Sequence, residues 1–188
     1  MLLHLDSRLR GNDERSDARS TSVIELRLAK VAMAASLALF AFLVAFNNLT
    51  DYGSNFAFVQ HVLSMDTTFP GNALRWRAIT TPILWHAAYW LIIAGEALTC
   101  VAYAIGSVAL LGALRAGGAA FNRAKRLVYV GTALGFLVWF LGFMVIGGEW
   151  FAMWQSPTWN GQPAAFRFYA ALLGVGIFVG LEDRDLAD

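Results

Sequence analysis

The stretch LWHAAYWLIIAGEALTC, residues 84–100, is predominantly apolar and carries a single charged residue, Glu96. As a helix, a run of this length crosses most of a hydrocarbon layer of ~30 Å. Because lipid offers no hydrogen bonds, backbone groups inside that layer must pair within a helix or a closed barrel. The alternation of apolar and polar residues that a barrel strand needs is absent here. The stretch therefore predicts a membrane-spanning helix with an acidic residue inside it.

The composition of the whole chain also indicates a membrane protein. Of its 188 residues, 58% are hydrophobic and only 14% are charged, whereas an average soluble domain carries about 25% charged residues. The formal net charge of +1 argues against a strongly basic nucleic-acid binder. The single cysteine, Cys100, excludes an intramolecular disulfide, a thiol relay and a cysteine zinc site.

Four apolar segments have the length of membrane spans. They run over about residues 28–46, 82–114, 127–146 and 164–181, and each is near the ~20 residues that a spanning helix needs. We therefore predict an all-α integral membrane protein, a four-transmembrane-helix bundle that forms a single domain over residues 23–188. Residues 1–22 mix acids and arginines without apolar periodicity, which predicts a disordered cytoplasmic tail or an over-extended start.

The long first outer loop contains a further short helix. GSNFAFVQHVLSMD, residues 53–66, predicts an amphipathic helix that is capped by Ser54 or Asn55 and stops at Asp66. At ~100° per residue, its phenylalanine, valine, leucine and methionine side chains share one half of the helical wheel. We expect this helix to lie flat on the outer membrane surface or across the mouth of the bundle, as a structural lid.

The lysines and arginines predict the orientation of the bundle. All of them except Arg75, Arg77 and Arg167 fall in the N-terminal region, in the loop between the second and third spans, or near the C-terminus. Because cytoplasmic loops are enriched in these residues, both termini are expected in the cytoplasm.

Two stretches resemble a known family. They are NNLTDYGSNFAFVQHVLSMDTTF, residues 47–69, and LRWRAITTPILWHAAYWLIIAGEALTC, residues 74–100. Over about residues 26–182 the chain resembles the bacterial family of predicted small integral membrane proteins, a domain of unknown function. The resemblance implies a four-helix protein of the bacterial inner (plasma) membrane. It implies no activity, substrate or cofactor.

Glu96 is the first candidate functional residue, because an ionised carboxylate near the membrane midplane costs at least ~2.5–3.5 kcal/mol. The other spans offer no countercharge at matching depth. Three interpretations stay open. Glu96 is a neutral structural residue bonded to a hydroxyl such as Thr99, Ser36 or Thr132, or it meets a partner from outside the chain, or it carries protons. The outside partner would be another subunit, a quinone, a cation or a pigment.

His86 is the second candidate, ten residues before Glu96. Helical geometry places the two about 80° apart around the axis and about 15 Å apart along it, so they cannot share one ligand. His86 is expected near the outer interface, where it could meet His61 or Asp66 of the predicted lid. A satisfied interfacial histidine is the plain interpretation, and an axial haem ligand is the functional one. No metal site is predicted.

Arg75 and Arg77 lie on the outer side, against the charge bias, so we expect acidic partners for them. The candidates are Asp51, Asp66 and Glu149. A salt-bridged clamp of the loop is one interpretation, and binding of lipid headgroups or of an anionic ligand is the other.

Glycines recur at the spacing that lets membrane helices approach closely. Gly131 and Gly135 form a GxxxG pair in the third span, and Gly176 and Gly180 form another in the fourth. The pairs predict packing within the bundle, with contact to another subunit as the alternative.

No phosphate-binding loop, nucleophile elbow or zinc-protease motif occurs in the sequence. The small size, the glycine pairs and the unpaired Glu96 favour a non-enzymatic accessory or assembly subunit that packs in the bilayer against another integral membrane protein. A small proton-coupled transporter using Glu96 is one alternative. A haem- or quinone-binding redox protein using His86 is another. No cofactor and no nucleic-acid partner are predicted.

Overall fold

The computed structural model describes residues 2–185 of the chain, and the side chains of residues 20–185. This part of the chain is built from helices and loops and contains no β-strand. Four helical segments are long and apolar enough to cross a membrane: Ser20–Thr50, Pro82–Gly112, Gly118–Trp150 and Gln162–Gly180. The predicted all-α membrane fold with four spans is thereby confirmed.

The helices follow one another with short connections. Helix α1 (Leu2–Thr50) contains the first span, and α2 (Tyr52–Ser64) follows after a single residue. A short turn, η1 (Arg75–Arg77), leads into α3 (Pro82–Gly112). The third span consists of α4 (Gly118–Ala124), α5 (Arg126–Phe136) and η2 (Leu137–Trp150), and η2 has π-helical hydrogen bonding. The turn η3 (Met153–Gln155) and helix α6 (Gln162–Gly180) complete the bundle.

Helix α1 is longer than the sequence predicted. Its backbone is helical from Leu2, within the segment expected to be a disordered tail, and it continues past residue 46 to Thr50. Adding turns to an existing helix requires no new nucleation, which is a physical reason for the helix to continue into polar sequence. The side chains of the first 19 residues lie outside the described part.

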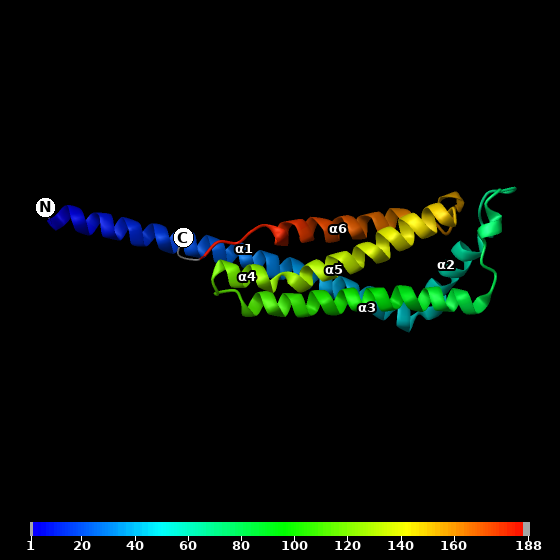
Figure 1. Cartoon of the computed structure of the whole chain (residues 1–188), viewed down its shortest axis with the longest axis horizontal. Coiled ribbons are helices and arrows are strands. Elements are labelled where there is room, and N and C mark those ends of the chain that lie inside the picture. Colours follow the sequence, from blue (N-terminus) through cyan, green and yellow to red (C-terminus); the bar gives the residue numbers. More distant parts are fainter. Residues whose placement is uncertain (1, 186–188) are drawn as a thin grey trace.

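Figure 1 shows the four spans lying along the long axis of the molecule, with α2 folded against one end of α3. The C-terminal segment lies at the opposite end, beside the first span. We call these two ends the lid end and the terminal end. Helix α1 packs mainly on α3, α3 on α5, and α6 on α5 and η2.

The lid is helix α2, which covers the lid end with its apolar face. Val59, Val62 and Leu63 are buried there against Tyr89 and Ile93 of α3. The amphipathic pattern therefore identified the correct face, and α2 lies across the mouth of the bundle.

The bounds of the lid differ from those expected. The helix begins at Tyr52 because α1 runs on to Thr50 and only Asp51 separates the two, so Ser54 and Asn55 lie inside α2 and cap nothing. Ser54 Oγ instead donates to Asp51 Oδ1 at 2.9 Å. The helix ends before Met65, which adopts a left-handed backbone with φ 52°.

The predicted packing glycines face neighbouring helices of the same chain. A Cβ on Gly131 would stand 2.9 Å from the Tyr103 ring, and one on Gly176 would stand 2.9 Å from Thr132. A Cβ on Gly135 would clash with Leu172. Gly180 differs, because a Cβ added there would be 3.9 Å from its nearest neighbour, the ring of Tyr129. Apart from Gly180, these glycines permit close contact inside the bundle.

Candidate functional site

Glu96 lies inside the bundle and is bonded to α1. Asn48 Nδ2 donates a hydrogen bond to Glu96 Oε2 at 2.7 Å. The hydroxyl of Tyr89 donates to the backbone oxygen of Asn48 at 3.1 Å. Glu96 is only 2% exposed and Asn48 8%, so the pair is shielded from the surroundings. An amide donor thus gives the carboxylate a neutral partner.

The hydroxyl partners expected for Glu96 are wrong. Thr99 and Ser36 donate to carbonyl oxygens four residues earlier in their own helices, at 2.7 and 2.8 Å. Thr132 bonds the Tyr103 hydroxyl at 2.9 Å. Serine and threonine in helices commonly satisfy themselves on the preceding turn. An asparagine has two amide donors that can reach farther, but it is not conspicuous in the sequence when it lies near a helix end.

The Glu96–Asn48 pair lies toward the lid end of α1. Lys30 is near the other end of this span, and 18 residues separate it from Asn48. At about 1.5 Å per residue this distance is about 27 Å. The midplane depth expected for Glu96 stays a prediction.

Glu96 lines a cavity of about 210 Å³. Its walls come from α1, α2, α3, η2 and α6, with Phe58 of the lid on one side and Trp139 and Phe143 of η2 on another. Apolar cavities of about 150 Å³ accept a molecule the size of benzene, so this one has room for a small ring or polar head. Among the described residues that line it, Glu96 is the one carboxylate, and none is a histidine, lysine or arginine.

The π-helical segment η2 shapes this cavity. Trp139 and Phe143 both project from η2 into the cavity wall, and Trp139 is 2% exposed. π-Helical turns are rare and are often found at functional sites. This change of winding could not be predicted from the sequence, because residues 137–150 are almost uniformly apolar.

The two histidines at the lid end, His61 of α2 and His86 of α3, do not join Glu96. His86 Nδ1 bonds the Tyr52 hydroxyl at 2.8 Å, and its ring stacks on Phe56 at 4.2 Å. His61 pairs with Asp66 at 2.8 Å and stacks on Trp159 at 4.7 Å. The expected meeting of His86 with His61 or Asp66 is therefore wrong, because Asp66 turns back at the end of α2 and bonds the histidine on its own helix. No three histidine, cysteine or acidic residues in the described part lie together as a metal site would require.

Arg77, in the segment before α3, contacts two aromatic rings and a carbonyl. Arg77 donates to the backbone oxygen of Trp150 at 3.2 Å, and its guanidinium lies 4.5 Å from the Trp150 ring centre and 5.3 Å from that of Trp76. In the described part of the chain, no ion pair joins Arg75 or Arg77 to Asp51, Asp66 or Glu149. A guanidinium stacks favourably on tryptophan, and for Arg77 this contact takes the place of the acidic partner expected from the sequence.

Comparison with known proteins agrees with this architecture. Residues 26–182 match the model of a family described as predicted small integral membrane protein (DUF2165). The chain belongs to this family. The resemblance suggested by the two loop-and-helix stretches is thereby confirmed, and so is the assignment to an integral membrane protein. The searches of curated proteins and of solved structures found no match.

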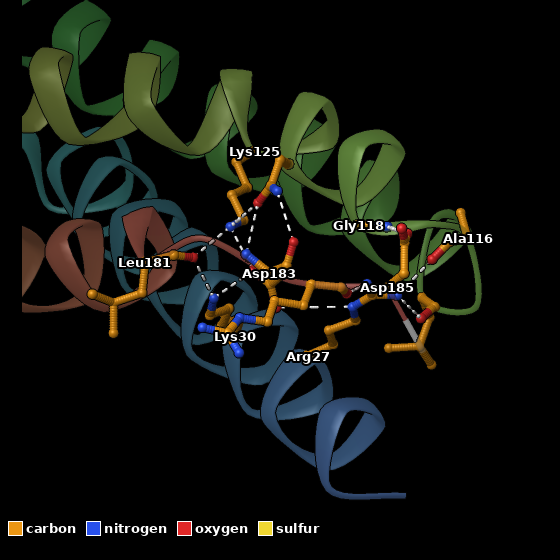
Figure 2. A network of polar contacts seen from close by, with 11 residues as sticks. Arg27, Lys30, Ala116, Gly118, Lys125, Leu181, Asp183 and Asp185 are labelled. Carbon is orange, nitrogen blue, oxygen red and sulfur yellow. Dashed lines mark hydrogen bonds and ion pairs between the residues drawn. The ribbon is translucent and has the colours of Figure 1, made fainter. Parts of the chain in front are cut away.

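The protein also has a buried charge cluster at the terminal end. Figure 2 shows this cluster around Asp183. Lys30 Nζ and Lys125 Nζ each lie 2.5 Å from Asp183 Oδ2, and Arg27 Nε lies 3.8 Å from Oδ1. Arg27 and Lys30 are fully buried, and Lys125 and Asp183 are 1% and 4% exposed. Asn122 fastens the same segment by donating to the Asp183 backbone oxygen at 2.9 Å.

The sequence did not identify this cluster as a unit. Its three cations served only to predict the orientation of the bundle, and the family match ends one residue before Asp183. One signal was present, since Lys30 is followed by a long run without another charge and lies where a lone cation would need a partner. The cluster ties the C-terminal segment to α1 and α4, and its charged residues do not line the Glu96 cavity.

Proposed function

We propose that the protein binds a lipid-soluble molecule in the cavity beneath the lid, and that Glu96 and Asn48 receive its polar head. The observation that supports this function is a buried carboxylate facing an otherwise largely apolar space of about 210 Å³. Ligand sites are typically apolar hollows with a few placed polar groups. A hydroxyl or amine can donate to the carboxylate, whereas an anionic head would be repelled by it.

Ligand binding is favoured over the accessory-subunit function because of where the polar and small residues lie. Glu96 is internal and bonded to Asn48, so it does not offer a charge to a neighbouring protein. Gly131, Gly135 and Gly176 are close to side chains of their own bundle. Glu96 and these glycines, which suggested a partner protein, therefore make their contacts within this chain. Assembly with another membrane protein stays a prediction without support from these residues.

The two remaining alternatives fit less well. A redox protein using His86 would need that residue at the cavity, but His86 does not line it and its Nδ1 is bonded to Tyr52. A proton carrier at Glu96 would need neighbouring titratable groups to pass protons. Tyr89 is the other titratable residue in the described lining, and its hydroxyl donates to a backbone oxygen.

Filling the cavity should remove the bound molecule. Ala164 of α6 lines the cavity, and Ala164→Leu places a larger side chain in the space for the head. Overpacking costs about 1–3 kcal/mol, so the amount of ligand retained through gentle purification should fall about tenfold or more. The readout is mass spectrometry of lipids extracted from the purified protein, relative to the detergent-solubilised membrane.

The matched control is Ala170→Leu, on the same helix but exposed on the lipid side. It should retain the same enriched molecule as the wild type. Glu96→Gln keeps the size of the side chain and loses its charge, and it should also lower retention. If wild type, Ala164→Leu and Glu96→Gln carry identical lipid profiles, the cavity holds no specific ligand and the proposal fails.

The orientation proposed for the protein places the terminal end in the cytoplasm of a bacterial cell and the lid outside the inner membrane. The support is the concentration of lysines and arginines at the terminal end. In a Cys100→Ala background, a membrane-impermeant maleimide should label Thr158→Cys in intact spheroplasts, and Ala119→Cys only after lysis. Both reporter positions are exposed. Labelling of Ala119→Cys before lysis would reverse the orientation.

A further inference from the structure

We infer that the ligand is a phosphate-free amphiphile with a hydrocarbon chain, and that it reaches Glu96 from the bilayer by passing between α3 and η2. This inference rests on the proposed function and adds the class of the ligand and its route. It comes from two apolar hollows: the first adjoins the Glu96 cavity, and the second adjoins the first.

The first hollow lies under the lid and has a volume of about 190 Å³. It shares four wall residues with the Glu96 cavity: Phe58, Val59, Ile92 and Phe143. The rings of Phe58 and Phe143 stack at 5.8 Å and belong to both walls. This aromatic pair is therefore the partition between the two spaces, and a rotation of either ring would join them.

The second hollow is a groove of about 350 Å³ between α3 and the third span. It shares Leu91, Ile92, Gly142 and Ile146 with the hollow under the lid. Leu91 is 75% exposed and Leu98 56%, so in the membrane this groove faces lipid tails. A hydrocarbon chain from the bilayer can lie in it without exchanging apolar contacts for water.

The groove lies beside Glu96, at the same level of the bundle. It follows α3 from Leu91 to Leu98, and Glu96 falls between these two residues on the helix. Ile92 lines all three spaces, so an amphiphile with its head at Glu96 reaches the groove by extending its chain sideways past Ile92.

The side of the bundle that faces water at the lid end is covered. The backbone N–H of Ile79 donates to Leu63 O at 2.8 Å, and Thr67 Oγ1 donates to Ser156 Oγ at 2.8 Å. These bonds fasten the lid region to both of its neighbours. A ligand that enters laterally, between α3 and η2, requires neither of these hydrogen bonds to break.

The charge of the Glu96 carboxylate determines which polar head group can bind in the cavity. A phospholipid would bring a phosphate toward the Glu96 carboxylate, and no lysine or arginine among the described lining residues could offset that repulsion. An amine or hydroxyl head satisfies both the carboxylate and the amide oxygen of Asn48. The occupant is thus distinguished from the bulk lipids that surround the same groove.

Photo-crosslinking can locate the chain. The probe is dodecylamine with a diazirine at the far end of its chain, added to the full-length protein in phosphatidylcholine nanodiscs. After illumination, adducts should concentrate on residues 91–98 and 134–146, above the level at Ile177, which is 70% exposed on the lipid face of α6. Glu96→Gln should lower the groove adducts about tenfold and leave those at Ile177 unchanged. The same chain with a carboxylate head should show no preference for the groove.

A second pair of variants tests the groove without touching Glu96. Leu98→Trp narrows it and should displace the adducts, whereas Val101→Trp, on the same helix and 51% exposed, should not. If groove adducts are equal in wild type, Glu96→Gln and Leu98→Trp, the chain contacts are those of bulk lipid and the lateral route is wrong. The lipid-extraction experiment separates the two proposals: a ligand lost in Ala164→Leu but with no groove adducts leaves the cavity function standing, and no retained ligand at all removes both.

Discussion

Replacing Asp183 with alanine should lower the free energy of unfolding by about 3–5 kcal/mol, the cost of leaving buried charges without their partner. The Asp183 carboxylate lies 2.5 Å from both Lys30 Nζ and Lys125 Nζ and 3.8 Å from Arg27 Nε. The three cations are almost completely buried. The alanine variant would therefore leave them facing one another without an anion.

Backbone carbonyls offset part of this positive charge, but they cannot replace the carboxylate. Arg27 donates to the carbonyls of Ala116 and Arg184, each at 2.7 Å, and Lys30 and Lys125 both donate to Leu181 O at 2.7 Å. The Arg184 and Leu181 carbonyls are held in place by the same C-terminal segment that Asp183 anchors. Loss of the anchor should release that segment and with it several of the remaining acceptors.

The effect can be measured by denaturant unfolding in mixed micelles, with Glu182→Ala as the matched control. Glu182 is the neighbouring carboxylate and is exposed, so its loss should change stability by less than about 1 kcal/mol. Asp183→Asn keeps the size and one acceptor, and it should fall between the two. Equal stability of Asp183→Ala and Glu182→Ala would contradict a structural role for the cluster.

The sequence predicted the architecture well because its signals are local. Spans follow from runs of apolar residues, and the buried face of α2 follows from the spacing of Val59, Val62 and Leu63 within one helix. The spans can be predicted from the lengths of the apolar runs without knowing which helices contact one another. The same reasoning explains why the helix bounds differ from those expected, most of all for α1, which begins at Leu2, because polar sequence beyond a span can continue an existing helix without a new nucleus.

The partners at the site could not be predicted because they depend on contacts between distant segments. Glu96 bonds Asn48, which is 48 residues earlier, and Lys30 bonds Asp183, which is 153 residues later. Spacing along one helix says nothing about either pair.

The second large effect on stability is expected at Gly106. Whether a substitution there stabilises or destabilises the protein tests how closely α3 and α5 pack. A Cβ on Gly106 of α3 would stand 2.9 Å from the backbone nitrogen of Val128 and 3.2 Å from the backbone carbon of Leu127. Backbone atoms of α5 cannot rotate away as a side chain can. Gly106→Ala should therefore push α3 and α5 apart and destabilise the protein by about 1–3 kcal/mol.

Alanine is the better helix former by about 0.8–1 kcal/mol, so where there is room the same substitution should stabilise. Gly174 of α6 is such a position, because it is exposed and nothing lies within 4 Å of an added Cβ. We expect Gly106→Ala to lower and Gly174→Ala to raise the midpoint of unfolding under the same conditions. The contrast isolates helix contact from helix propensity, because both variants add one methyl group to a membrane span. An unchanged or raised midpoint for Gly106→Ala would mean that α3 and α5 are not in backbone contact at Gly106, and the packing of the third span against α3, which contributes walls of the Glu96 cavity, would have to be revised.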